Sequence, residues 1–169
     1  IVISLVGSEM CIRDRYRNLS QITAHFSFSI LILSILFNNI FSSEVITNLK
    51  INETYQAQNL KINFESIEQE NKQNFKAIKG KFIVEDQSGL IEVMQPELRI
   101  YNQPNIVTSE ADIKTNIFTD KFMTMNYVQN QDYFNIRYQV KPFMIWIWIS
   151  TILLCLSGCL SLIRKKYEN

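Results

Sequence analysis

Apolar residues are concentrated in two blocks, one toward each end of the chain. The later block, 143–163, contains no charged residue and is rich in Ile, Leu and Trp. At a helical rise of about 1.5 Å per residue it is about 31 Å long, which is enough to cross the hydrocarbon core of a bilayer. The earlier block, 22–41, contains one ionisable residue, His25. The pattern predicts two transmembrane helices, over 20–42 and 143–163.

The residues beside the second span predict its orientation. Three consecutive cations at 164–166 follow it directly, and cationic clusters next to a spanning helix tend to remain in the cytoplasm. The tail 164–169 is therefore expected inside and the segment 44–141 outside. Pro142 precedes the span, where the first turn of a helix tolerates proline. Trp146 and Trp148 are expected near the outer boundary of the bilayer.

The segment between the two spans, 44–141, predicts strands. Apolar and polar residues alternate in 79–86 and in 133–140, which is the period of a half-buried strand. One helical turn is expected over 108–116, where Thr108 or Ser109 resembles an N-cap. A segment of this length can bury one modest core as a small β-barrel or sandwich. The expected strands lie in 54–67, 74–86, 90–101, 117–128 and 133–140.

Composition and charge exclude several classes of function. The net charge is +1, and acids and bases are about equal in number within 44–141, which disfavours a nucleic-acid surface. Cys155 and Cys159 are one turn apart in the second span and Cys11 is near the N-terminus, so the cysteines do not form a disulfide framework. The chain shows no Gly-rich phosphate loop, no Cys/His metal spacing and no Ser–His–Asp set.

The N-terminal segment does not match the rest of the chain. Its core, SLVGSEMCIRDR, looks like a translated sequencing adapter. A signal peptide is the alternative, but here the apolar part precedes the basic part, which is the reverse of the order in signal peptides. We therefore expect residues 1–16 to be a non-native leader, and the true upstream sequence to be missing.

His25 is the one candidate ligand. Gln21, His25 and Ser29 follow at intervals of four residues and share one face of the first span, while Ser27 and Ser34 are a heptad apart on a neighbouring strip. Lipid cannot satisfy polar groups, so such a stripe normally turns toward other helices or a cofactor. Imidazole is a common axial ligand of haem iron. Alternatively, His25 makes a hydrogen bond in the interface region of the membrane.

Two charged residues in the middle segment are candidates for a structural pair. Glu97 and Arg99 are two residues apart on an expected strand, so their side chains point to the same side. We expect an ion pair there. The remaining acids of the segment are scattered and are expected to be solvated.

The order of several short motifs resembles the C-terminal part of the CcmF family of cytochrome c-type biogenesis proteins, which are haem lyase subunits. The family has similar stretches in the same order, of which the last below is the most specific. The chain departs from the family pattern at Leu98, Phe122 and Ile145, which suggests a divergent member. The matching stretches are AHFSF (24–28), QPELRIY (95–101), TSEADI (108–113), TDKF (119–122) and VKPFMIWIWI (140–149).

The resemblance implies a membrane protein of the α+β class, with two transmembrane helices flanking a small periplasmic β domain in the bacterial inner membrane. It implies that His25 ligates a haem b together with a ligand outside this chain. It implies partners: a haem chaperone, apocytochrome c and other cytochrome c maturation subunits. The family's Trp-rich haem-handling segment is absent here, so enzymatic activity of the chain alone is uncertain and no catalytic residue is assigned.

A second reading remains open. The chain could instead be a two-span membrane protein whose extracytoplasmic β domain is a binding or assembly module without a cofactor. An upstream reading frame with many more spans would favour the haem lyase.

Overall fold

The computed structural model describes residues 2–57, 60–86, 89–128 and 131–168, and the side chains of these ranges between 19 and 162. The chain divides into two compact units. The first, which we call the helical unit, consists of Ile1–Phe41 and Pro142–Asn169. The second, the β unit, is Ser42–Lys141.

The helical unit contains one helix from each end of the chain, α1 (Val2–Phe41) and α2 (Met144–Glu168). The segments Leu19–Phe41 and Met144–Leu162 are long and apolar enough to cross a membrane. Only 17% and 11% of these segments are buried. A core helix of a soluble protein would bury most of its apolar side chains, whereas a membrane helix exposes them to lipid. The chain is therefore a membrane protein, as the two apolar blocks predicted.

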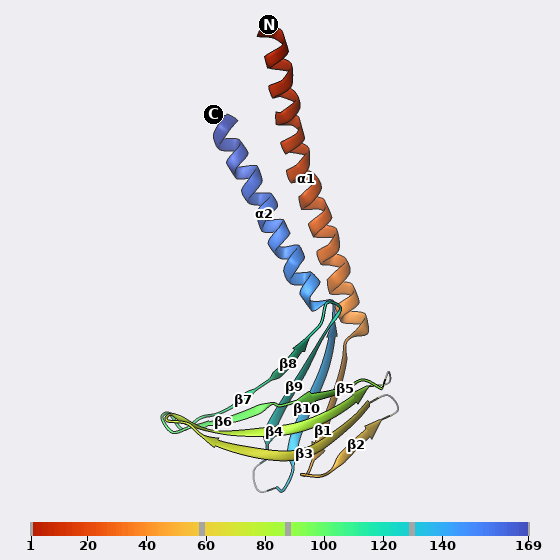
Figure 1. Ribbon diagram of the computed structural model, residues 1–169, viewed down its shortest axis with the longest axis vertical. Helices are drawn as coiled ribbons and strands as arrows, with labels where there is room; N and C mark the ends of the chain where they lie inside the picture. The colour runs from red at the N-terminus through yellow and green to blue at the C-terminus, as the bar shows by residue number, and fades with distance from the viewer. Residues whose placement is uncertain (1, 58–59, 87–88, 129–130, 169) are drawn as a thin grey trace. The chain divides into compact units, whose positions relative to one another are not determined.

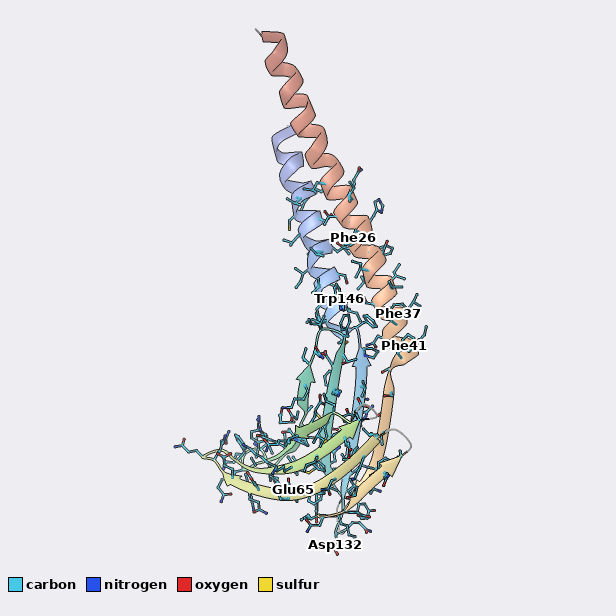
Figure 2. The ribbon with its side chains drawn as sticks, turned by 45° about the vertical axis from the view of Figure 1, so that its right-hand side comes forward. Phe26, Phe37, Phe41, Glu65, Asp132 and Trp146 are labelled. Carbon is cyan, nitrogen blue, oxygen red and sulfur yellow. The ribbon has the colours of Figure 1, made fainter. Side chains whose placement is uncertain are left out.

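The β unit is a sandwich of two mainly antiparallel sheets (Figure 1). One sheet has the order β1-β10-β9-β8, and the other has the order β2-β3-β4-β6-β7 with β5 also paired to β4. The expected small all-β domain is confirmed. The strands are β1 (Ser43–Leu49), β2 (Thr54–Ala57), β3 (Leu60–Asn71), β4 (Phe75–Asp86), β5 (Ile91–Met94), β6 (Glu97–Tyr101), β7 (Val107–Glu110), β8 (Asp112–Thr115), β9 (Thr119–Tyr127) and β10 (Phe134–Pro142).

The core of the β unit lies between the sheets. Phe64 and Phe82 stack there with ring centroids 4.3 Å apart. Both side chains are fully buried, which removes large apolar areas from water and drives the sheets together. Burial also raises the pKa of the Tyr138 hydroxyl well above its usual range. The buried core comprises Leu49, Ile62, Phe64, Phe82, Val84, Met94, Leu98, Met123, Met125, Ile136 and Tyr138.

The two sheets are also joined by polar contacts. The strand pair β7–β8 passes from one sheet to the other, because β7 pairs with β6 and β8 pairs with β9. The Lys121 ammonium lies 2.9 Å from a Glu92 carboxylate oxygen, and the two residues belong to different sheets. The side chain of Lys121 is only 13% exposed, so this ion pair is poorly screened by solvent.

Three expectations about local structure were wrong. The segment 108–116 contains no helical turn, because its backbone forms β7 and β8, which pair with β6 and β9. The single strand expected over 54–67 is a hairpin, in which Thr54–Ala57 pairs with Leu60–Asn63. Pro142 ends β10 and does not enter the first turn of α2.

The strand 43–49 was not predicted at all, although it pairs with β10 along its whole length. The expected strands 74–86, 117–128 and 133–140 are confirmed with small shifts of their ends. The expected strand 90–101 is interrupted, since β5 ends at Met94 and β6 begins at Glu97. The side chains of Cys11 and of the cations at 164–166 lie outside the described residues. The backbone of α1 is helical from Val2, so no break marks the expected leader boundary at residue 16, and that boundary stays a prediction.

Candidate functional site

A line of buried serines joins the two spanning helices. Ser20 and Ser157 exchange hydrogen bonds between each hydroxyl and the other's backbone oxygen, at 3.1 and 2.8 Å. Ser27 lies seven residues after Ser20 on α1, and Ser150 lies seven residues before Ser157 on α2. Both are fully buried. Small residues let membrane helices approach closely. The Ser27 and Ser150 hydroxyls donate to backbone oxygens of their own helices. We call this line, which continues to Ser34, the serine seam.

The serine seam determines which face of α1 remains open. His25 is two residues from Ser27, so at 3.6 residues per turn their side chains point about 160° apart. His25, Gln21 and Ser29 are exposed, in agreement with the polar stripe expected from the sequence. They line a shallow open hollow together with Ile22 and Phe26. The helix α2 of this chain therefore does not cover the stripe.

The local structure keeps His25 available as a ligand. Its backbone oxygen accepts a hydrogen bond from the Ser29 hydroxyl at 2.8 Å, which bonds Ser29 within its own helix. No hydrogen bond or ion pair to the imidazole occurs among the described side chains. Ile22 and Phe26 are 64% and 61% exposed beside it.

An exposed imidazole with apolar neighbours fits one face of a haem, which needs an axial nitrogen and an apolar surface for the porphyrin. The described residues hold no group of three or more His, Cys, Asp or Glu side chains that could bind another metal. The chain has one histidine. A second imidazole ligand would therefore come from outside this chain.

A network of charged side chains covers the outer face of β3, β4, β6 and β7. Arg99 lies 3.1 Å from Glu97, which confirms the pair expected from the sequence. Arg99 also approaches Glu110 at 3.7 Å, and Lys79 bridges Glu97 and Glu70 at 3.3 and 3.2 Å. Lys72 also lies 3.7 Å from Glu70. Among the described side chains, the network thus contains three cations and three anions and is a neutral structural surface. It joins residues of the two motif stretches QPELRIY and TSEADI, because β6 and β7 are paired.

The cations and carboxylates of this network stabilise each other in their charged forms. Partial burial raises the pKa of Glu97, but hydrogen bonds from Arg99 and Lys79 outweigh it, so that the net pKa lies below the usual 4.5. The hydrogen bond from Lys79 lowers the pKa of Glu70. The carboxylates are therefore held charged, and neither is set up as a proton donor near neutral pH.

Sequence reasoning found His25 and its stripe but missed the role of the buried serines. Ser27 and Ser34 were noticed only as a strip beside His25. The signal was present in their heptad spacing and in the matching spacing of Ser150 and Ser157. Pairing the two sets required the three-dimensional register of the helices.

Comparisons with known proteins show what the chain is similar to. The family model described as CcmF C-terminal beta-sandwich matches residues 40–142. The cytochrome c-type biogenesis protein ccl1 of Rhodobacter capsulatus is 29% identical over 120 residues, which cover 71% of this chain and 18% of that protein. The cytochrome c-type biogenesis protein CcmF of Pseudomonas aeruginosa is 22% identical over 145 residues, covering 86% of this chain and 22% of that protein.

A solved structure has the same fold. The structure named Cytochrome c Heme Lyase CcmF aligns with a TM-score of 0.63 and 18% identity, over 88% of this chain and 25% of that one. The chain thus spans about a fifth to a quarter of the proteins that it matches. The family model covers more than half of the chain and the whole β unit. The chain therefore belongs to the CcmF family and contains its C-terminal β-sandwich.

Proposed function

We propose that this chain is the C-terminal part of a haem lyase subunit that assists covalent attachment of haem to apocytochrome c, and that His25 provides one axial ligand to a haem b in the membrane. The observation that carries the ligand assignment is the exposed His25 face of α1, opposite the serine seam. Membership of the CcmF family supports the role in cytochrome c biogenesis.

Each residue of the hollow has a role in this proposal. The His25 imidazole would hold the haem iron, and Ile22 and Phe26 would supply an apolar surface for the porphyrin. Gln21 and Ser29 are placed to contact polar edges of the group or of a neighbouring helix. A haem supplies redox chemistry when bound. The serine seam holds α1 in one rotational setting, so that His25 points away from α2 and toward the rest of the membrane protein.

The proposed topology follows from the charges at the end of the second span. The cations at 164–166 favour a cytoplasmic C-terminus. The β unit is then periplasmic and the protein belongs to the bacterial inner membrane as a multi-pass subunit. In that location the β unit offers a surface to the haem chaperone, to apocytochrome c or to other maturation subunits.

The ligand assignment is tested with His25→Gly in the membrane-embedded protein. We expect loss of the b-type absorbance bands and of haem in a pyridine haemochrome assay, because an axial ligand is missing. Added imidazole should restore the bands, since the glycine leaves space for a free ligand. The matched control is Ile40→Ala, an exposed residue of the same helix that does not line the hollow, and it should retain the haem. Full haem content in His25→Gly would refute the ligand assignment. A native protein that contains no haem would instead favour a β module without a cofactor.

The topology is tested separately with single cysteines in the β unit. A cysteine at Asp132 should react with a membrane-impermeant maleimide in intact spheroplasts. Reaction only after lysis would place the β unit in the cytoplasm and contradict the proposed location. This outcome would leave the haem ligand assignment to be decided by its own experiment.

A further inference from the structure

The connection between β8 and β9 is a tight turn with two apolar residues at its tip. The Asn116 backbone N–H donates to the Thr119 backbone oxygen at 2.9 Å, and the Ile117 N–H donates to the Asn116 side-chain oxygen at 2.7 Å. Ile117 and Phe118 occupy the two central positions, and each is 59% exposed. Gly, Asn and Asp are the usual residues in such turns. A pair of large apolar side chains there is unfavourable in water.

This tip lies at the end of the β unit where the chain enters and leaves. Strand β1 begins at Ser43, opposite Val140 near the end of β10. Strand β9 lies beside β10 and runs in the opposite direction. It therefore begins at the end of the sheet where β10 ends (Figure 1). The Lys141 ammonium lies 5.5 Å from the centre of the Phe122 ring. Phe118 comes four residues before Phe122 in the sequence. At the rise of a strand, the tip therefore lies about 13 Å from Phe122, on the side where the chain leaves the β unit.

Covalent connectivity joins this end directly to both candidate membrane spans. The β unit begins directly after Phe41, the last residue of α1, and Lys141 is followed by Pro142 and then α2. Both helices are long enough to span a bilayer. Two short connections at one end of a rigid sandwich leave that end little freedom to move away from the lipid.

We propose that Ile117 and Phe118 insert into the headgroup region of the leaflet from which α1 and α2 enter, so that the β8–β9 hairpin is a third membrane contact of the β unit. Aromatic and aliphatic side chains are favourable at that depth. Lys114 and Lys141 lie near the same end and carry long side chains that can reach lipid phosphates. The occupant is lipid, and the inference does not depend on haem binding.

The opposite end of the sandwich provides a matched control. The turn after β1 contains Ile51, which is 48% exposed. It lies at the far end because β1 ends at Leu49, opposite Phe134 at the start of β10. Ile51 is comparable to Phe118 in chemistry and exposure but is remote from the chain exit.

The test uses nitroxide labels on Phe118→Cys and Ile51→Cys, with the native cysteines replaced by serine, in nanodiscs of phosphatidylcholine and phosphatidylglycerol. Power-saturation EPR then compares accessibility to oxygen, which concentrates in lipid, with accessibility to a water-soluble nickel chelate. We expect oxygen to dominate at Phe118 and the chelate to dominate at Ile51, so that the accessibility ratio reverses between the two turns.

Two results would overturn the inference. Greater accessibility to the chelate at Phe118 would show that the tip is in water. Low accessibility to both reagents would show that another protein segment covers it. The label replaces one exposed side chain, and circular dichroism of each labelled protein checks that the β unit is intact.

Discussion

Ser20 and Ser157 are 137 residues apart in sequence and exchange two hydrogen bonds between α1 and α2. Each hydroxyl donates to the backbone oxygen of the other residue, so neither leaves a polar group unsatisfied between the helices. Near the other end of the helical unit, the Asn38 side-chain amide donates to the Pro142 oxygen at 2.7 Å. These contacts set one antiparallel register for the pair and leave the His25 face open.

The register predicts which cysteine pairs can be cross-linked. In a background without native cysteines, Ser20→Cys with Ser157→Cys should form a disulfide on mild oxidation, because their side chains face each other across the interface. The control pair, Ser29→Cys with Ser157→Cys, should remain reduced, since Ser29 is exposed on another face of α1. Mass spectrometry of peptides measures both. Equal cross-linking of the two pairs would contradict the register.

Phe143 should prefer glycine to alanine as a replacement. It has a φ of 58°, which is in the left-handed region where side chains other than Gly and Asn are rarely found. Its ring lies 5.3 Å from that of Phe37, and this contact helps to hold the conformation. Both Phe143→Gly and Phe143→Ala lose the ring pair, but the glycine relieves backbone strain. We expect Phe143→Gly to be the more stable by about 1 kcal/mol in reversible detergent unfolding.

Phe37 is the matched control for the order of stability of the glycine and alanine variants. Its replacement removes the same ring pair, but Phe37 is at a regular helix position. There glycine is the poorer residue, so Phe37→Ala should be more stable than Phe37→Gly by about 1 kcal/mol. If alanine is better at both positions, the strain assigned to Phe143 is absent.

Gly80 should not tolerate a side chain. A Cβ atom added there would lie 2.6 Å from Phe82 Cε2 and 2.8 Å from Met125 Sδ, both in the closely packed core. Gly80→Ala should destabilise the β unit by about 1–3 kcal/mol through overpacking. Near-UV circular dichroism during thermal unfolding measures the loss. Gly158→Ala is the control, because nothing lies within 4 Å of its added Cβ, and it should leave the β unit unchanged.

The charged network predicts a loss of stability in acid. The folded-state pKa values of Glu70 and Glu97 lie below the usual value of 4.5, so these groups stabilise the fold above that pH. The contribution is lost as pH falls through the lower folded-state values. The melting temperature of the β unit should therefore fall below about pH 4.5. The double variant Glu70→Gln, Glu97→Gln should show a shallower fall than the native protein.

Salt offers an independent check on the same network. The side chain of Glu70 is 49% exposed and that of Glu97 is 23% exposed. Mobile ions screen charges that reach solvent. At about 1 M NaCl the difference in melting temperature between the native protein and the double variant should shrink. A difference that is insensitive to both pH and salt would mean that the ion pairs are not its cause.

Much of this architecture was predictable because it depends on local pattern. Apolar length predicts the two spans, since a bilayer requires about 20 apolar residues in succession. Alternation predicts strands over 79–86 and 133–140, because one face of each is buried. The spacing of Gln21, His25 and Ser29 predicts a shared helical face, and five ordered motifs indicate the family.

The remaining features depended on partners distant in sequence. Thr108 and Ser109 resemble a helix cap, yet hydrogen bonds from neighbouring strands make 107–115 two strands that pass between sheets. Proline is compatible with either the start of a helix or the end of a strand. Pro142 is the last residue of β10, because β10 pairs with neighbouring strands. Local sequence contains no information on those partners.

By itself, the sequence determined two membrane helices, a strand-rich segment between them and a histidine on a polar helical face, because each follows from periodicity over a few turns or one strand. Only the tertiary structure decided that Ser20 meets Ser157, that α2 covers the serine seam and leaves His25 exposed, and that an apolar hairpin tip lies beside the chain exit. The physical reason is that the covered face of a helix and the end of a sheet at which a turn lies depend on contacts between residues far apart in the chain.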